Sequence, residues 1–396
     1  MRRSLQTMEA IHEVSIPVGP LNIVGMKGCE DLVGKVDRHL AEWRAQRHGE
    51  LMSESEFIGY CRDSYLIKTS CPRFGNGEGK GIIKETVRGH DLYIVVDCFN
   101  YGVTYGMYGL TVPMSPDDHY QDLKRIIAAS SGKARRINVI MPMLYEGRQH
   151  RRASRESLDC AICLQELAAM GVDNLITFDA HDARVQNAIP LSGFENVQPT
   201  YQFLKAMVNT VPDLKINKDH LMIISPDEGG MSRCMYYASV LGVELGMFYK
   251  RRDYSVIVQG KNPIVAHEFL GNNVEGKDLI IVDDMISSGE SVLDIATQLK
   301  ARGAGRIFIC ATFGLFCEGL EKFDEAYKRG DITKVFTTNL IYRTPELQAR
   351  PWYREVDMAK YIAYIIDTLN HDQSISGLLD PVHRINKLLE RVRGGE

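Results

Sequence analysis

The stretch 277–291 constrains the fold of this chain more than any other, because an apolar strand there leads directly into acidic and small residues. Leu279–Val282 has the length and branched composition of a buried parallel strand. Two acids, a loop rich in serine and an amphipathic helical pattern follow it. Ligands bind at such strand ends in open α/β sheets, so the stretch predicts a binding site in an α/β fold.

The loop after this strand combines two kinds of ligand chemistry. The backbone N–H groups and hydroxyls of Ser287–Ser291, with Gly289 allowing a close approach, suit a phosphate monoester at a helix N-terminus. Asp283 and Asp284 would repel phosphate and suit vicinal hydroxyls or a hydrated Mg²⁺. A loop that suits phosphate beside two acids that suit hydroxyls predicts a sugar phosphate as the ligand. The alternative is a strand followed by a helix with a serine N-cap.

Length and composition indicate a soluble globular protein of two domains or one large one. The chain has 396 residues, of which 44% are hydrophobic and 25% charged. Its formal net charge of −4 gives no general attraction for nucleic acid or an anionic membrane. The N-terminus lacks an apolar signal region, and no run of about 18 apolar residues occurs. We therefore expect no nucleic-acid or membrane partner.

The cysteine pattern predicts a reducing cytoplasm. Nine cysteines are scattered without the density of a disulfide scaffold. Cys160 and Cys163 form a Cys-x-x-Cys pair in a helical pattern without a second pair nearby, which favours core thiols over a zinc site.

Alternating strand and helix patterns predict right-handed β-α-β units and mainly parallel sheets flanked by helices. Residues 1–20 form an extension, 44–70 read as an insertion, and two similar halves divide near 195–199. Ile82–Val87 and Leu92–Asp97 are expected to form a hairpin. The remaining strands are expected at 21–25, 137–141, 174–178, 221–225, 246–249, 279–282, 307–312 and 334–339. Helices are expected at 30–43, 118–129, 156–170, 200–211, 230–241, 291–302, 319–328, 356–369 and 381–392.

Further residues that could bind a ligand or a metal ion follow other expected strands. Asp179 and His181 should lie on one side of an extended segment, where His181 suits a metal ligand, a phosphate partner or a structural role. Asp227 precedes a double glycine at the start of a helix and is either a ligand group or part of a turn. Basic runs at 148–152 and 250–252 suit a polyphosphate, although a solvated charged surface is the alternative. The P-loop and Rossmann glycine patterns are both absent from the sequence.

Six stretches of the sequence, in this order, resemble the ribose-phosphate pyrophosphokinases, also called phosphoribosyl pyrophosphate (PRPP) synthetases. They are Phe74–Glu78 with Glu85–Gly89, Gly147–Gln149, Asp179–His181, Ser225–Gly230, Tyr249–Arg252 and Val282–Ser291. The resemblance runs from about Leu21 to the C-terminus, with breaks at roughly 44–70 and 106–120. It implies two tandem phosphoribosyltransferase-type domains, at 21–197 with the ATP site and at 198–396 with the ribose 5-phosphate site. The last helices are candidates for packing on the first domain.

The resemblance also implies an activity, the transfer of pyrophosphoryl from Mg-ATP to ribose 5-phosphate, and an oligomer, either a dimer or a hexamer. It implies a role for each of the following residues. Ribose 5-phosphate would contact Asp283, Asp284, Ser287, Ser288, Gly289 and Ser291; ATP would contact Phe74, Asn76, Glu78, Arg148 and Gln149; His181 and Asp227 would position Mg²⁺; Lys250, Arg252 and His181 would be catalytic.

Two residues depart from the family pattern, and two other functions share parts of it. Ser287 and His150 stand where common synthetases have acids. A phosphoribosyltransferase that consumes PRPP would share the loop 282–291, although it would not need Arg148 or Lys250. A non-catalytic regulatory subunit would be expected to lose the basic and metal-positioning residues that this chain retains.

Overall fold

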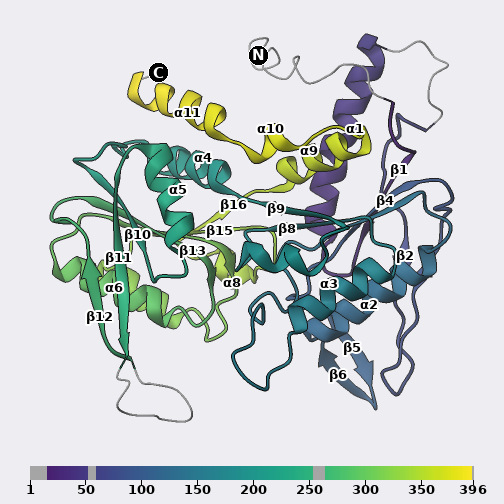
Figure 1. Ribbon diagram of the computed structural model, residues 1–396, viewed down its shortest axis with the longest axis horizontal. Coiled ribbons are helices and arrows are strands. Elements are labelled where there is room, and N and C mark those ends of the chain that lie inside the picture. Colours follow the sequence, from purple (N-terminus) through teal and green to yellow (C-terminus); the bar gives the residue numbers. More distant parts are fainter. Residues whose placement is uncertain (1–15, 52–58, 253–263, 395–396) are drawn as a thin grey trace. The chain divides into compact units, whose positions relative to one another are not determined.

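The protein folds into two compact units, and the chain passes between them more than once (Figure 1). The structure is a computed structural model that describes residues 16–51, 59–252 and 264–394. Unit 1 comprises Met1–Val197 and Ala359–Asp380. Unit 2 comprises Gln198–Met358 and Pro381–Glu396. Most of the expected 1–20 extension lies outside the described residues.

Unit 1 is built on a sheet of five parallel strands, ordered β1-β4-β7-β8-β9. Helices α2 and α3 cover one face and α1 and α9 the other (Figure 1). The strands are β1 (Leu21–Gly25), β4 (Asp91–Val95), β7 (Arg136–Ile140), β8 (Asn174–Phe178) and β9 (Gly193–Val197). The helices are α1 (Glu30–Leu51), α2 (Pro116–Ser130), α3 (Asp159–Ala169), the 3-10 helix η2 (Ala183–Ala188), α9 (Ala359–Asn370) and α10 (Ser376–Leu379).

Unit 2 contains a seven-stranded sheet, ordered β12-β11-β10-β13-β14-β15-β16, in which β12 is antiparallel to β11 and the other pairs are parallel. The strands are β10 (Leu221–Ser225), β11 (Glu244–Arg252), β12 (Ile264–Leu270), β13 (Asp278–Ile286), β14 (Ile307–Gly314), β15 (Lys334–Thr338) and β16 (Tyr353–Val356). The helices are α4 (Thr200–Thr210), α5 (Met231–Leu241), α6 (Glu290–Ala301), α7 (Glu321–Arg329), α8 (Pro345–Gln348) and α11 (Val382–Gly394).

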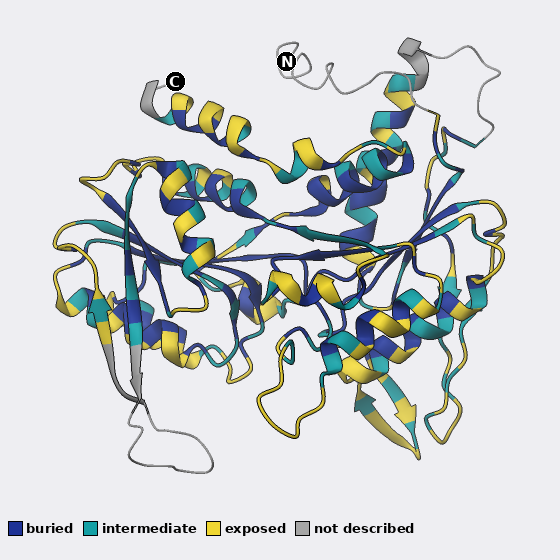
Figure 2. Cartoon of the chain, viewed as in Figure 1, coloured by how far each residue is buried: buried dark blue, intermediate teal, exposed yellow. Residues whose placement is uncertain are grey.

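The predicted α/β class with mainly parallel sheets is confirmed. β4 of unit 1 and β10 and β14 of unit 2 are buried throughout (Figure 2), because parallel strands covered by helices on both faces have no solvent side. Cys160 and Cys163 are buried free thiols of α3, as predicted. None of the helices in the described ranges is long and apolar enough to cross a membrane.

The expected hairpin of 82–87 with 92–97 is wrong. β3 (Ile82–Ile83) instead pairs with β2 (Thr69–Ser70), and β4 is a parallel strand between β1 and β7. A second small hairpin, of β5 (Thr104–Met107) and β6 (Leu110–Pro113), occupies a segment for which no strand was expected. β9, β12 and β16 were also not expected, and α1 extends eight residues beyond its predicted end at Trp43.

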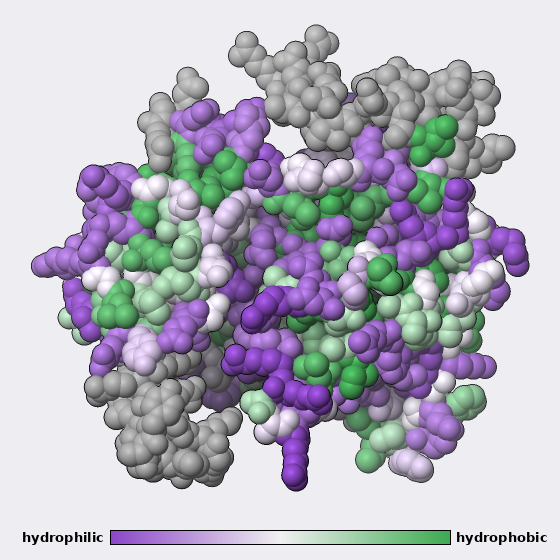
Figure 3. Space-filling model, in the orientation of Figure 1, coloured by the Kyte–Doolittle hydropathy of each residue, from purple (hydrophilic) through white to green (hydrophobic). Residues whose placement is uncertain are grey.

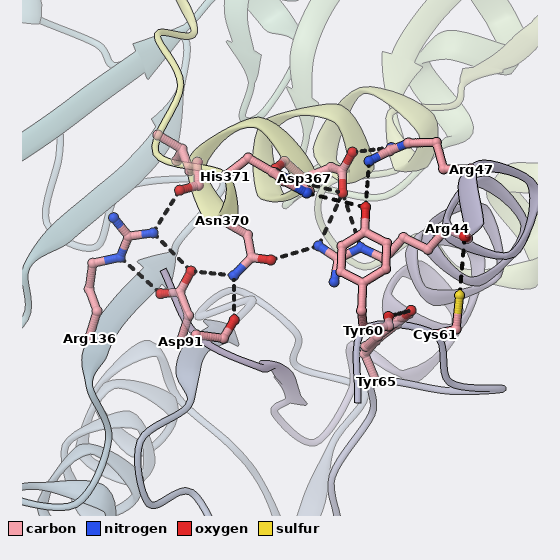
Figure 4. A network of polar contacts seen from close by, with 12 residues as sticks. Arg44, Arg47, Tyr60, Cys61, Tyr65, Asp91, Arg136, Asp367, Asn370 and His371 are labelled. Atoms are coloured by element: carbon pink, nitrogen blue, oxygen red, sulfur yellow. Dashed lines mark hydrogen bonds and ion pairs between the residues drawn. The ribbon is translucent and has the colours of Figure 1, made fainter. Parts of the chain in front are cut away.

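A buried polar network joins α1 and α9 within unit 1 (Figure 4). Asp367 of α9 accepts hydrogen bonds from Arg44, at 3.0 Å, and from Arg47. Asn370 accepts one from Arg44 at 2.7 Å and donates one to Asp91 of β4 at 2.9 Å. Burial alone would raise the pKa of Asp367, but the two guanidinium groups hold it below its usual value. The network therefore fixes α9 to residues more than 270 positions away.

The same network makes the stability of unit 1 depend on pH through His371. Its Nδ1 lies 2.6 Å from the Asp367 carbonyl, which can only accept, and its Nε2 lies 3.2 Å from the Tyr60 hydroxyl. Burial lowers the pKa of His371; Asp367 opposes this shift, whereas Arg44 and Arg47 reinforce it.

A lowered pKa means that the unfolded chain binds this proton more readily than the folded unit does. Stability is then complete above the unfolded value of about 6.5 and decreases as the pH falls below it. We expect denaturant midpoints to fall between about pH 7.5 and about pH 5.5, and less steeply in His371→Gln. His383→Gln, on the exposed side of α11, is the control and should keep the wild-type slope. If the denaturant midpoint of His371→Gln falls with pH as steeply as that of the wild type, His371 is not the group responsible for the pH dependence.

Candidate active site

The loops at the carboxyl ends of β10 and β13 form the candidate sugar-phosphate site of unit 2. In the sheet, β11 lies on one side of β10 and β13 lies on the other. The direction in which successive strands are placed therefore reverses between β10 and β13. Such a reversal is where open α/β sheets bind ligands. Ile224 pairs with Ile281, which brings the turn after Ser225 beside the acidic end of β13.

The turn that contains Asp227 is compact and depends on glycine. Asp227 accepts a hydrogen bond from the N–H of Gly230 at 3.2 Å, and the Ser225 hydroxyl donates to the Asp227 carbonyl at 2.7 Å. A Cβ on Gly230 would lie 3.1 Å from the Ser225 hydroxyl, so a larger residue would disturb the turn. The half-buried Asp227 carboxylate is thereby held at the start of α5.

Asp283 and Asp284 lie within β13, not after it as the sequence suggested, because the strand continues to Ile286. Asp283 is half-buried and accepts a hydrogen bond from the Asp284 N–H at 2.9 Å, while Asp284 is buried. Burial and then the neighbouring carboxylate raise the pKa of Asp283 well above its usual value, and Arg233 opposes the shift. A cation or a pair of hydroxyl donors would relieve this crowding.

The loop from Ser287 to Gly289 leads directly into the N-terminus of α6. Gly289 has φ 83° and is the N-cap, without a side-chain cap, so the serine N-cap considered from the sequence is wrong. A Cβ there would lie 2.5 Å from Cζ of Phe323, a fully buried ring. The Cys317 N–H donates to the Ser287 carbonyl at 2.9 Å. The helix end is thus presented by a loop of fixed shape.

Gly289→Ala should damage this loop specifically. The substitution adds left-handed strain and a clash with Phe323, so the loop must shift away from its present path. We expect the affinity for ribose 5-phosphate to fall by about tenfold or more, the scale of one lost phosphate contact. Isothermal titration with ribose 5-phosphate measures it. Gly377→Ala, where a Cβ meets nothing within 4 Å, is the control; equal affinity in both variants would contradict the role of Gly289.

In unit 1, Arg148 and Gln149 follow β7 in a tight loop. Glu146 has φ 55° and its carbonyl accepts the Gln149 N–H at 2.9 Å. The Gln149 side chain donates to the carbonyls of Arg151 and Ser157, at 3.2 and 2.9 Å, so it braces the basic run. Arg148 is exposed and Gln149 half-buried. The arrangement presents a guanidinium to solvent from a fixed backbone.

His181 lies in the loop after β8. The expected extended segment is wrong, because Asp179 has φ 42° and is buried whereas His181 is exposed. The ring centres of His150 and His181 are 5.3 Å apart, and His150 Nε2 lies 3.5 Å from a carboxylate oxygen of Asp182. Hydrogen bonds from Arg184 hold the pKa of Asp182 far below its usual value. The structure therefore brings His150, which departs from the family pattern, beside His181.

The segment 73–79 forms a small loop of its own in unit 1. The N–H of Phe74 donates to the Glu78 carbonyl at 2.6 Å, and the Asn76 side chain donates to the Glu78 carboxylate at 2.7 Å. All three side chains are exposed. In unit 2 the backbones of Lys250 and Arg252 lie in β11 itself, opposite β12, while their side chains lie outside the described part of the chain.

Comparisons with known families fit this architecture. A family model described as the N-terminal domain of ribose phosphate pyrophosphokinase matches residues 21–171, and a phosphoribosyl transferase domain model matches residues 205–342. The chain belongs to the ribose-phosphate pyrophosphokinase family.

Similar members of this family are bacterial ribose-phosphate pyrophosphokinases. The protein of Chromobacterium violaceum is 27% identical over 322 residues, which cover 80% of this chain and 89% of the relative. That of Rhodopirellula baltica is 28% identical over 323 residues, covering 80% and 93%. The crystal structure of phosphoribosylpyrophosphate synthetase from Mycobacterium smegmatis matches with a TM-score of 0.69 at 20% identity, over 89% of this chain and 99% of that chain. The last comparison shows that the fold is shared.

Sequence reasoning missed several neighbours of the ribose-phosphate pyrophosphokinase loop 282–291. The ring of Phe323 packs behind Gly289, and the charge of Arg233 opposes the rise in the pKa of Asp283. Glu290, at the first position of α6, pairs with Lys322 at 2.7 Å. An acid inside a loop expected to bind phosphate was a signal in the sequence that a nearby cation was needed. Phe323 and Arg233 gave no comparable signal, because only the fold brings them to the loop.

Proposed function

We propose that this ribose-phosphate pyrophosphokinase family member transfers the pyrophosphoryl group of Mg-ATP to the 1-hydroxyl of ribose 5-phosphate, giving PRPP and AMP. One observation carries the proposal. At the strand-order reversal of unit 2, two crowded carboxylates adjoin a helix N-terminus that begins at a glycine and has no side-chain cap. A diol suits the first group and a phosphate the second.

The acceptor sugar phosphate would occupy unit 2, in the proposed domain 198–396. Asp283 and Asp284 would receive its hydroxyls, and Ser287, Ser288, Gly289 and Ser291 would bind its 5-phosphate. Lys322, which also pairs with Glu318 at 2.8 Å, supports this assignment by offsetting part of the negative charge of Glu290 at the helix N-terminus. Without that lysine the acid would oppose the favourable potential of the helix end.

The nucleotide would occupy the proposed domain 21–197. Arg148 and Gln149 would bind its phosphates, since an exposed guanidinium on a braced loop suits polyphosphate. Phe74, Asn76 and Glu78 would bind the base, and in a dimer or hexamer they would reach it from a neighbouring subunit. Lys250 and Arg252 would stabilise charge on the transferring group, with His181 contacting substrate oxygens.

Mg²⁺ would accompany ATP and offset part of its negative charge when bound. Among the described residues, no group of three or more His, Cys, Asp and Glu side chains converges as a ready metal site. Mg²⁺ commonly uses one or two carboxylates together with substrate phosphates. The half-buried Asp227 carboxylate fits such a donor. His181 fits better as a partner of coordinated oxygens, because Mg²⁺ prefers oxygen ligands. The nine free cysteines favour a cytoplasmic location.

The test is to incubate the pure protein with ATP, Mg²⁺ and ribose 5-phosphate and to quantify AMP and PRPP by ion-exchange chromatography. Equal amounts of both products are expected, and omission of ribose 5-phosphate or addition of EDTA should abolish them. ATP left intact, with a complex formed with an active synthetase, would establish the regulatory subunit instead. Consumption of added PRPP with a purine base would establish a phosphoribosyltransferase.

A further inference from the structure

The tip of the β5–β6 hairpin places an aromatic residue in an unfavourable backbone conformation. Met107 pairs with Leu110, so the turn consists of Tyr108 and Gly109, with φ 48° and 79°. Positive φ at both positions defines a type I′ turn, for which Asn, Asp and Gly are preferred at the first position. A bulky residue is strained there, and such strain is found where a side chain has a function.

The hairpin is fastened to the loop 74–78. The Tyr108 N–H donates to the Gly75 carbonyl at 2.8 Å. A Cβ on Gly77 would lie 2.7 Å from the Met107 sulfur, so the two segments are in close contact. At the base of the loop, the Arg73 guanidinium lies 5.0 Å from the centre of the Tyr105 ring. An isolated two-stranded hairpin is only marginally stable, so these contacts fix where Tyr108 lies.

The aromatic side chains of the two segments face solvent instead of the core. Tyr108 is 77% exposed and Phe74 is 54% exposed. The hairpin projects from unit 1 (Figure 1), and apolar colours are mixed with polar ones at that end of the molecule in Figure 3. Neither ring contributes to the core of unit 1. Both are therefore available to a ligand.

We infer that Tyr108 is a second base-recognition residue, whose ring stacks on the purine base bound by the loop 74–78. The inference rests on the proposed function, because it concerns the same nucleotide. Beside the two rings, Asn76 and Glu78 offer amide and carboxylate groups already linked to each other at 2.7 Å. Aromatic faces together with hydrogen-bonding edges match a heterocyclic base. An apolar partner surface would have no use for the polar pair.

Tyr108→Asn tests the inference, because it should move stability and affinity in different directions. Asparagine tolerates the left-handed turn, so the thermal midpoint should not fall. Loss of the ring should raise the KM for ATP by about tenfold, the effect of one lost base stack, with kcat and the KM for ribose 5-phosphate unchanged. Tyr108→Phe keeps the ring and should retain the wild-type KM.

Leu110→Ser is the matched control, since it removes an exposed apolar side chain from the same hairpin without removing an aromatic ring. Its KM for ATP should equal that of the wild type. If the wild type forms PRPP while Tyr108→Asn keeps its KM for ATP, the inference is wrong and the proposed function stands. If Tyr108→Asn and Leu110→Ser both reduce the oligomer size in analytical ultracentrifugation and leave the KM unchanged, the hairpin is a subunit contact and the inference is also wrong. Absence of PRPP from the wild type would overturn the proposed function itself.

Discussion

Replacing Asp367 by alanine is expected to lower the free energy of unfolding of unit 1 by about 3–5 kcal/mol, the cost of removing one partner of a buried ion pair. The Arg44 side chain is 1% exposed and that of Asp367 is 6% exposed. Without the carboxylate, Arg44 keeps its hydrogen bond to Asn370 and loses its only negative partner among the ion pairs of the described chain. An uncompensated charge in a buried position is costly.

Fluorescence of Trp43 during urea unfolding can measure this effect in a Trp352→Phe background, which removes the other tryptophan of the chain. Trp43 of α1 stacks on Tyr364 of α9, with ring centres 4.4 Å apart, so it reports directly on the contact that Asp367 supports. Asp372→Asn is the control: its side chain is 78% exposed in its pairing with Arg136, and asparagine tolerates its φ of 53°. Similar losses in the two variants would argue against the special importance of the buried pair.

Lys250→Ala is expected to reduce turnover by about 10²-fold or more, because a transition-state contact to the transferring phosphoryl group would be lost. The KM for ribose 5-phosphate should change little, since the loop 282–291 is the proposed binding site of the acceptor. Steady-state rates of AMP formation, with each substrate varied in turn, separate the two effects.

The control for Lys250 is Lys35→Ala, which removes a lysine paired with Asp31 on the surface of α1. It should leave the rates unchanged. Equal losses in turnover and in ribose 5-phosphate affinity after Lys250→Ala would indicate a role in binding, and an unchanged turnover would remove Lys250 from the proposed catalytic set.

The sequence was most informative where burial dictates composition. β8 and β10 were predicted to the residue, since each is a short apolar run that ends in polar residues. The strand pattern alone could not identify pairing partners. Ile82 and Leu92 begin extended segments separated by a short glycine-containing turn, which favours a local hairpin, yet β4 pairs with strands that are distant in sequence. Long-range burial decided that pairing.

In the candidate site, too, some features could be predicted from the sequence and others could not. The loop 282–291 was recognisable because its acids, serines and glycine are adjacent in sequence. The ring of Phe323 behind Gly289 and the approach of His150 to His181 arise from tertiary packing and have no local signature. β9, with the sequence Gly-Phe-Glu-Asn-Val, was missed because an edge strand has less need of apolar residues.

The return of the chain from unit 2 to unit 1 has a consequence for synthesis on the ribosome. Arg44 emerges early, but its partners Asp367 and Asn370 are translated more than 320 residues later. At about 5–20 residues per second, this delay is on the order of 15–60 seconds. During that time α1 lacks α9, and unit 1 remains incomplete however quickly its sheet forms. Folding of the first unit is thus coupled to translation of nearly the whole chain, and a nascent chain stalled before Ala359 should stay open to proteases and chaperones.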